Sequence, residues 1–311
     1  MAYARNVMKQ PSEKSKLALK LSIVVASVII MLGLLSFIGK KENADSTIIA
    51  SNFASYDLAR AVTKNSGHEV KMLVAPGSDL HHYEPSQQDV IDIQNSKLFI
   101  YAGGESESWT ENLSAPEKLK LIDTKGLKLL REDGEDEIDE HFWASPSNYL
   151  LLLEAVMDKL IEIDPSNEAL YRENANKYRE EIQTLSEDIM AVTKGHEQKM
   201  IVFADRFPAK YFFDEYNLSY MAAFNGCAED TEADAMTLAT MINTINAEGI
   251  ESVFTIELSD QKLANTVAEQ TNVKILKFQS TQNISKEDFE SGKTYVDLMT
   301  ENIGPLQEAL Q

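Results

Sequence analysis

The chain has 311 residues and is 43% hydrophobic, which suffices for one large packed domain or two ordinary ones. Its 50 acidic and 29 basic residues give a net charge of -21 at pH 7. This acidic excess argues against nucleic-acid binding, which requires a basic face. An acidic surface suits the attraction of cations, although surface charge also serves solubility alone.

The first 46 residues are predicted to attach the protein to a membrane. Residues 1–20 are basic, residues 21–38 form an uncharged apolar run, and residues 39–46 form a polar linker. An apolar run of 18 residues is near the lower length of a membrane-spanning helix. The lysines before it place residues 1–20 in the cytoplasm and the rest outside, by the positive-inside rule. We expect an uncleaved anchor; the alternative is a cleaved signal peptide and a secreted protein.

Short apolar runs alternate with helical stretches over the remainder of the chain. The predicted strands are 47–50, 70–74, 98–101 and 121–122, followed by 200–203, 218–222, 253–256 and 274–278. The clearest predicted helices are 56–63, 149–163, 236–247 and 261–270. This alternation predicts an α/β fold with two lobes, residues 47–163 and residues 196–311. Each lobe is expected to hold a roughly four-stranded, mostly parallel sheet flanked by helices.

Residues 164–195 are predicted to form one long rigid helix that connects the lobes. Asp164-Pro165-Ser166-Asn167 is a helix-start signal, and Gly195 is a plausible stop. Apolar residues recur at alternating spacings of four and three, which predicts a stripe on one helix face. The stripe consists of Tyr171, Ala175, Tyr178, Ile182, Leu185, Ile189 and Val192. A helix from Pro165 to Thr193 would be roughly 40 Å long. A coiled-coil dimer is the alternative, but the position between two strand sets favours the connecting helix.

Two short motifs hold three of the five histidines and predict part of a metal site. They are Asp-Leu-His-His-Tyr-Glu-Pro at residues 79–85 and Asp-Glu-His-Phe-Trp-Ala-Ser-Pro at residues 139–146. Neutral imidazole is the commonest side-chain ligand of transition metals. His81 follows the second predicted strand and His141 follows the fourth. The acidic stretch 132–140 is expected to be a solvated, mobile loop, and the alternative is that it concentrates cations near His141.

The second lobe offers acidic candidates at equivalent places. Asp205 follows the first strand of that half, and Glu257 ends a later strand. Because ligands of open α/β lobes bind at the carboxyl ends of strands, we expect these groups to converge with the histidines on a cleft. Each residue alone also has an ordinary role. A lone histidine is more often hydrogen-bonded or exposed, and Asp205 suits a helix cap. Glu257 suits bonding to backbone amides or pairing with Arg206.

The order and spacing of these motifs resemble the substrate-binding proteins of zinc and manganese ABC importers. The resemblance covers nearly everything from Thr47 to Leu310. Residues 79–84 and 139–146 match histidine motifs of these proteins, with Leu80 and Glu140 each replacing a proline. The further matches are Asp205-Arg206-Phe207-Pro208, Tyr211-Phe212, Phe224-x-Gly226-Cys227, Thr231-Glu232, the strand before Glu257, and Gly292-x-x-Tyr295-x-x-Leu298-Met299-x-x-Asn302.

The resemblance implies one metal in the cleft between the lobes, with two ligands from each. His81 and His141 are the implied first-lobe ligands, and Asp205 is the candidate for the third position. The fourth position falls on Gln282, in a stretch where relatives have Cys-His-Asn. A ligand histidine and a disulfide partner for Cys227, the only cysteine, are therefore missing. Glu257, a water molecule or His82 are the alternatives for the fourth ligand. Oxygen ligands shift the metal preference from zinc toward manganese.

The resemblance further implies an extracytoplasmic monomer that captures zinc or manganese and delivers it to an ABC permease, without being an enzyme. The chain has no Gly-x-x-x-x-Gly-Lys-Ser/Thr loop for ATP. A metal-dependent hydrolase, with His81, His141 and Asp205 holding a metal-bound water, is one alternative. A degenerate family member acting as a surface adhesion protein is the other. Protonation of the two histidines opposes metal binding, so affinity is expected to fall as the pH drops through about 6.5.

Overall fold

The computed structural model describes residues 47–132, 136–224 and 235–311. The predicted anchor at 21–38, its basic flank, the linker 39–46 and Cys227 lie outside the described residues. Among the helices that are described, none is both long and apolar enough to cross a membrane. Residues 45–311 form one compact unit.

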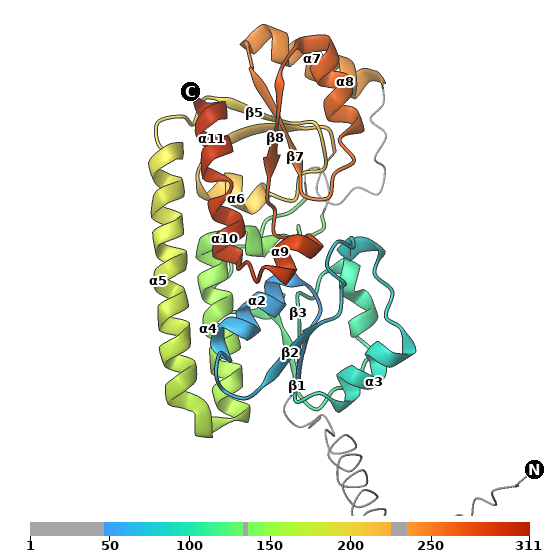
Figure 1. The fold of residues 1–311 in the computed structure, drawn as a ribbon. Coiled ribbons are helices and arrows are strands. Elements are labelled where there is room, and N and C mark those ends of the chain that lie inside the picture. Colours follow the sequence, from blue (N-terminus) through green and yellow to red (C-terminus); the bar gives the residue numbers. More distant parts are fainter. Residues whose placement is uncertain (1–46, 133–135, 225–234) are drawn as a thin grey trace, which may run out of the picture. The chain divides into compact units, whose positions relative to one another are not determined.

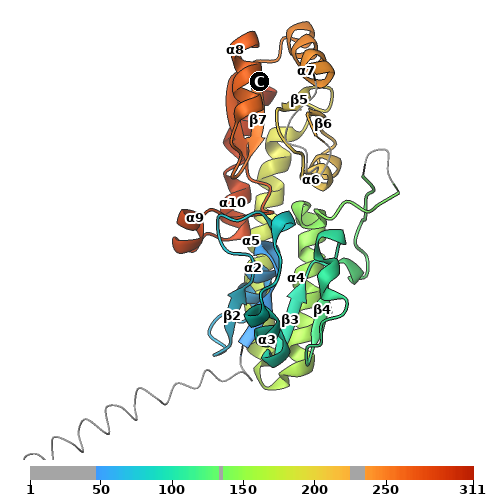
Figure 2. The same ribbon diagram turned by 90° about the vertical axis from the view of Figure 1, so that its right-hand side faces the viewer.

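The N-terminal lobe, or N-lobe, is built on a four-stranded parallel sheet with the order β2-β1-β3-β4 (Figures 1 and 2). Every residue of β1 and β3 is buried, which accounts for the continuous apolar runs that predicted them. The strands and their helices are β1 (Thr47–Ala50), α2 (Phe53–Val62), β2 (Glu69–Met72), α3 (Gln87–Asn95), β3 (Leu98–Tyr101) and β4 (Lys118–Lys120).

The strand predicted at 121–122 is wrong, because Leu121–Asp123 forms a 3₁₀ turn. The true strand, β4, lies at the edge of the sheet and pairs only with β3 among the described strands. Edge strands commonly contain lysines, and β4 contains Lys118 and Lys120. The strand therefore has no apolar run from which it could be predicted. Leu121 is apolar because its side chain is buried in the core just after the strand ends.

The C-terminal lobe, or C-lobe, repeats the arrangement with the order β6-β5-β7-β8, again all parallel. Phe203, at the end of β5, centres an aromatic cluster in which its ring lies 4.9–5.6 Å from four others, those of Phe207, Phe213, Phe254 and Phe278. The elements are β5 (Met200–Phe203), α6 (Lys210–Glu215), β6 (Ser219–Ala222), α7 (Ala235–Glu248), β7 (Ser252–Ile256), α8 (Lys262–Thr271) and β8 (Lys274–Phe278). The two-lobed α/β prediction is confirmed.

A helical hairpin links the lobes. Helix α4 (Pro146–Ile163) turns at Asp164 into α5 (Glu168–Thr193), whose 26 residues span about 39 Å. The predicted stripe of α5 is buried against α2, α4, α10 and α11 of the same chain, so no second chain is needed to cover it. At the end of the stripe Thr193 takes the buried position, whereas Val192 is only half-buried.

The segment after β8 returns to the N-lobe and then runs back along α5 (Figure 1). Its helices are α9 (Lys286–Glu290), α10 (Tyr295–Thr300) and α11 (Ile303–Leu310). Tyr295 stacks on Tyr149 of α4, with ring centroids 3.7 Å apart, and the Arg60 guanidinium donates to the Lys293 carbonyl. Phe289 of α9 meets Tyr56 of α2 at 5.3 Å. The C-terminal segment therefore joins the lobes a second time.

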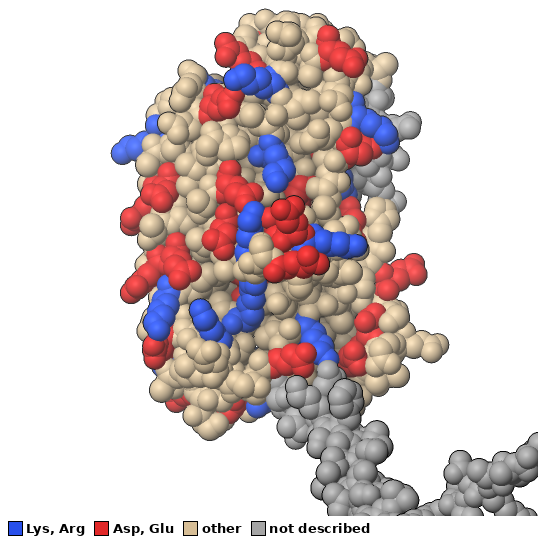
Figure 3. Space-filling model, viewed as in Figure 1, with Lys and Arg blue, Asp and Glu red and all other residues tan. Residues whose placement is uncertain are grey.

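Charged side chains are mixed rather than segregated on the face that includes α9, α10 and α5. Acidic and basic groups alternate over this surface in Figure 3. Several form ion pairs, for example Lys293 with Asp288 at 2.5 Å and Lys177 with Glu173 at 2.6 Å. An exposed pair such as Lys177 with Glu173 contributes little to stability.

Candidate metal centre

The loop after β2 carries His81 and is held by both lobes. Asp79 begins the 3₁₀ turn Leu80–His82 by accepting from the His81 backbone N–H at 3.0 Å. The Leu80 backbone N–H donates to the side-chain oxygen of Asn283 in the C-lobe at 3.1 Å. The His82 side chain is 72% exposed, so His81 is the residue of the pair that faces the protein interior.

His141 lies at the start of the short turn before α4, and it is fully buried. Asp139 Oδ1 accepts from both the His141 backbone N–H at 2.8 Å and the His141 Nδ1 at 2.9 Å. Because Nδ1 faces Asp139, Nε2 is the ring atom that would meet a metal, as in carboxylate–histidine–metal triads. Burial opposes ionisation of Asp139, but His141 outweighs it and keeps the pKa of that carboxyl below its usual value. His141 does not directly follow the fourth strand, because a long hairpin separates it from β4.

The two predicted first-lobe ligands meet. The ring centroids of His81 and His141 are 6.0 Å apart, at an interplanar angle of 63°. Two imidazoles that share one zinc ion place their ring centres about 5 Å apart. A small side-chain adjustment would therefore let both rings bind the same ion. His81 Nε2 is buried and has no hydrogen-bond partner. A buried polar atom without a partner is costly, and a bound cation would relieve that cost.

Burial lowers the pKa of His81 to about 4, and the charges of His141 and Arg206 act in the same direction. The unfolded chain has an ordinary histidine pKa of about 6.5. The neutral His81 ring therefore contributes stability that is complete above about pH 6.5 and is lost as the pH falls toward about 4. The expected pH limit of metal binding shifts below 6.5 for this ligand, because neutral His81 is the binding form.

We expect the metal-free protein to lose more unfolding free energy between about pH 7 and about pH 5 than its His81→Gln variant does. The reason is that only the wild type must keep a buried imidazole neutral while the unfolded chain takes up the proton. Urea unfolding of both proteins at both pH values measures the difference. Parallel pH dependence of the two proteins, or an NMR titration midpoint of His81 near 6.5, would contradict the prediction.

The C-lobe carboxylates are occupied by backbone hydrogen bonds. Asp205 accepts from its neighbour Arg206 at 2.8 Å and from the Ile256 N–H at 3.2 Å. Glu257, which is 4% exposed, accepts from the Ser280 N–H and hydroxyl and from the Asn283 N–H. Burial raises the pKa of Glu257. These two residues fix the carboxyl end of the C-lobe sheet and the loop after β8.

Gln282 lies in that loop and is 3% exposed, with no partner for its side-chain nitrogen. It lines a small cavity between the lobes together with residues at the end of β2, among them Met72 and Val74. Asp205, Glu257 and Gln282 therefore gather at the C-lobe side of the interface. Their role as metal ligands stays a prediction.

Arg206 is a functional candidate that the sequence pattern does not single out. Its guanidinium binds Asp79 across the lobes at 2.8 Å, where the sequence suggests pairing with Glu257. Asp79 also holds the His81 backbone, so Arg206 fixes the loop that carries the first ligand. It further places a positive charge beside the histidine pair. Its position inside the matching motif 205–208 was the only signal in the sequence.

A second acidic group, in addition to Asp139, lies beside His141. Among the described residues, the metal-binding types that meet in a group of three or more are Glu132, Asp139 and His141, with ligand atoms within 4.8 Å of one another. Glu132 belongs to the acidic stretch that the sequence predicted to be a solvated loop. Its neighbours Arg131 and Ile138 pair in an antiparallel bridge, and residues 136–138 are solvent-exposed as expected.

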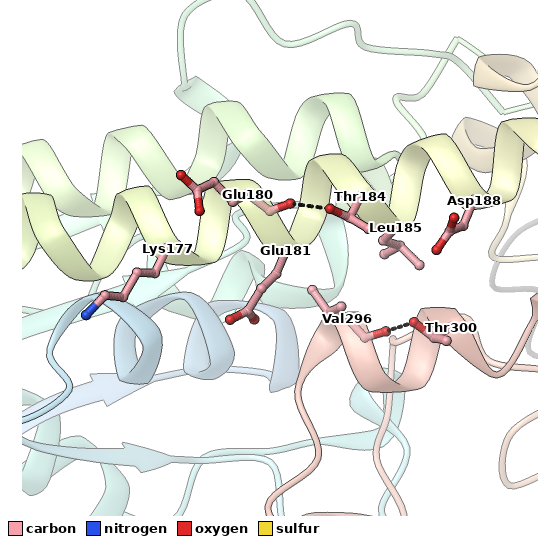
Figure 4. A pocket seen from close by; sticks show the side chains of 8 residues that line it. All are labelled: Lys177, Glu180, Glu181, Thr184, Leu185, Asp188, Val296 and Thr300. Atoms are coloured by element: carbon pink, nitrogen blue, oxygen red, sulfur yellow. Dashed lines mark hydrogen bonds between the residues drawn. The ribbon is translucent and has the colours of Figure 1, made fainter.

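A separate groove of about 440 Å³ lies between α5 and α10 (Figure 4). The Thr184 and Thr300 hydroxyls both donate to backbone carbonyls of their own helices, at 3.0 and 2.7 Å. The lining contains none of the sequence-predicted ligands; it consists of Lys177, Glu180, Glu181, Thr184, Leu185, Asp188, Val296 and Thr300. This groove is therefore not the predicted metal site.

Residues 48–309 match the family model described as ZnuA, zinc-uptake complex component A, periplasmic. The chain is 26% identical over 306 residues to the zinc-binding lipoprotein AdcA of Streptococcus pneumoniae (strain ATCC BAA-255 / R6), covering 93% of this chain and 60% of that protein. It thus spans about 60% of the length of this relative. It is 23% identical over 309 residues to the high-affinity zinc uptake system protein ZnuA of Bacillus subtilis (strain 168). This match covers 92% of this chain and 96% of that protein.

Solved structures agree with the fold. The Zn(II)-bound ZnuA-like domain of Streptococcus pneumoniae AdcA matches with a TM-score of 0.73 and 26% identity, covering 85% of this chain and 98% of that domain. The laminin binding protein Lmb of Streptococcus agalactiae matches with a TM-score of 0.76 and 21% identity, covering 86% of this chain and 99% of that one. Lmb is described as a bifunctional protein with adhesin and metal transporting activity. The likeness to Lmb shows the fold alone.

Proposed function

Because the chain belongs to the family of periplasmic A components of zinc-uptake complexes, we propose that it captures zinc or manganese for an ABC importer outside the cytoplasmic membrane. The observation that carries the proposal is the pair of His81, which is half-buried, and His141, which is fully buried, with ring centroids 6.0 Å apart at the junction of the lobes and His141 oriented by Asp139. The metal is cargo, and family membership places the chain among binding proteins rather than enzymes such as metal-dependent hydrolases.

Capture proceeds by exchange of ligands. The hydrated ion loses water molecules as the neutral imidazoles of His81 and His141 take their places. Asp139 holds the His141 ring in the tautomer that presents Nε2, so this ring needs no proton transfer on binding. Burial of the His141 ring and of His81 Nε2 limits competition from water and strengthens the bond between ion and protein.

Delivery requires partners beyond this chain. The proposed acceptor of the ion is the membrane subunit of an ABC permease, and the protein acts as a monomer. Residues 21–38 keep it at the membrane surface in this proposal, with release after signal cleavage as the alternative. The lipoprotein name of the Streptococcus pneumoniae relative is in keeping with a membrane-attached protein.

We expect the full chain, purified in mild detergent and stripped with a chelator, to bind one zinc ion with micromolar or tighter affinity. Manganese should bind more weakly, because imidazole favours zinc and zinc lies above manganese in the general affinity order. Titration calorimetry with each ion measures stoichiometry and affinity. Binding of neither ion would overturn the transport proposal and favour a family member with an adhesion role.

A further inference from the structure

We propose that Arg206 sets how tightly the captured ion is held, because its guanidinium places a permanent positive charge at the junction of the lobes. This inference rests on the proposed function and names a residue that regulates the same site. Arg206 lies just after β5 in the C-lobe, and its Nη1 donates to Asp79 Oδ2 of the N-lobe at 2.8 Å. Its charge opposes the bound ion and thereby favours release to an acceptor.

The guanidinium is fixed close to His81. Asp79 Oδ1 accepts from the His81 backbone N–H at 3.0 Å, so a single carboxylate joins Arg206 to the backbone of the first ligand. The side chains of Arg206 and Asp79 are only 15% and 23% exposed, which weakens the screening of their charges by solvent. Arginine keeps its proton in proteins, so this charge is present at every pH at which the histidines bind a metal.

His81 responds to the charge of Arg206. Burial lowers the pKa of His81 most, the charge of His141 comes next, and Arg206 adds to the effect while Asp79 opposes it. A proton on the ring and a metal ion at Nε2 both bring positive charge to the same side chain, and the two compete for it. The guanidinium therefore opposes a bound ion for the same physical reason that it opposes protonation.

The carboxylates of the C-lobe do not offset this charge on the side of the His81 loop. Both oxygens of Asp205 accept backbone N–H groups of the C-lobe. Both oxygens of Glu257 accept donors from the loop after β8, and burial raises the pKa of Glu257. Gln282, the remaining C-lobe candidate, carries no charge. The C-lobe thus presents a guanidinium to the His81 loop, while its carboxylates are engaged within their own lobe.

The test is Arg206→Gln, which removes the charge and keeps a side chain able to donate to Asp79. Zinc affinity is measured on the full chain by competition with a chromophoric chelator, and release by mixing the zinc-loaded protein with excess chelator in a stopped-flow instrument. We expect about 10-fold tighter binding and about 10-fold slower release, because a divalent ion no longer meets a like charge across a partly screened site. Arg206→Lys keeps the charge and should stay within about threefold of wild type.

Two further variants control for charge elsewhere and for the partner left behind. Lys274→Gln removes the same charge from an exposed ion pair with Glu308 at the start of β8, and it should leave zinc affinity unchanged. Asp79→Asn combined with Arg206→Gln removes both charges and should lose most of the gain. The double variant also avoids a partly buried carboxylate without its partner. Urea unfolding of the same samples shows that each variant is folded.

The outcomes separate this inference from the function on which it rests. If wild type binds zinc and Arg206→Gln binds it equally or more weakly, Arg206 only holds the His81 loop; the inference fails and the transport proposal stands. An equal gain in Arg206→Lys would show that geometry matters rather than charge, and an equal gain in Lys274→Gln would show an effect of net charge. Either result overturns the inference.

The remaining outcomes concern a wild type that binds no zinc. If Arg206→Gln then does bind zinc, the inference is supported and the proposed capture of zinc is overturned, since the guanidinium keeps the ion out. If neither protein binds zinc, both the inference and zinc capture are overturned.

Discussion

Replacing His81 and His141 together by alanine is expected to abolish zinc binding, with a loss of at least about 1,000-fold in affinity. Removing even an outer partner of a metal ligand costs about 10- to 100-fold, and this change removes two direct ligands. The two rings are the pair of histidines that meet at the lobe junction, 6.0 Å apart. Competition with a chromophoric chelator covers the affinity range that this comparison needs.

The control for this experiment is His82→Ala, whose side chain is 72% exposed next to His81. This variant should bind zinc like wild type. His141→Ala removes a hydrogen-bond donor from the buried Asp139, so urea unfolding is recorded on the same samples to show that the double variant is folded. A folded double variant that still binds one zinc ion tightly would refute the proposed site.

Phe203→Ala is expected to lower the free energy of unfolding by about 3–5 kcal/mol, the usual cost of truncating a buried aromatic ring. Phe203 is fully buried and touches four other rings at the end of β5, so the surrounding C-lobe core has little freedom to fill the space. Urea unfolding of the metal-free protein gives the value.

Phe289→Ala provides the matched comparison, because Phe289 is only partly buried on α9 and its one described ring contact is with Tyr56. It should cost clearly less than Phe203→Ala. Equal losses in the two variants would show that the aromatic cluster of the C-lobe does not dominate stability, contrary to its central position.

The central strands could be predicted from the sequence because burial on both faces leaves a continuous apolar run. The predictions for the central strands β1, β3 and β5 coincide with the observed bounds, and the prediction for β7 begins one residue late. The prediction of the edge strand β4 was wrong for the opposite reason. Its lysines interrupt any apolar run, and the apolar pair that follows it belongs to a turn. The return of α10 and α11 along α5 depends on packing between distant segments, which no local pattern records.

The candidate site was predictable in its N-lobe half. Histidine is rare in this chain, so two histidine motifs after predicted elements were a strong signal, and the structure brings His81 and His141 together. The approach of Glu132 to His141 depends on the register of a hairpin. The pairing of Arg206 with Asp79 depends on how the lobes dock. Neither can be read from spacing along the chain.

The double connection between the lobes limits how the ion can leave. If the lobes swung apart as two jaws, Tyr295 would slide off Tyr149, Arg60 would release the Lys293 carbonyl, and α11 would shear along α5. Such a motion breaks buried packing along the whole flank of the molecule. A local shift of the His81 turn or the hairpin breaks only a few hydrogen bonds. We therefore expect the ion to be released to an acceptor by a local loop movement rather than by a hinge motion of the two lobes.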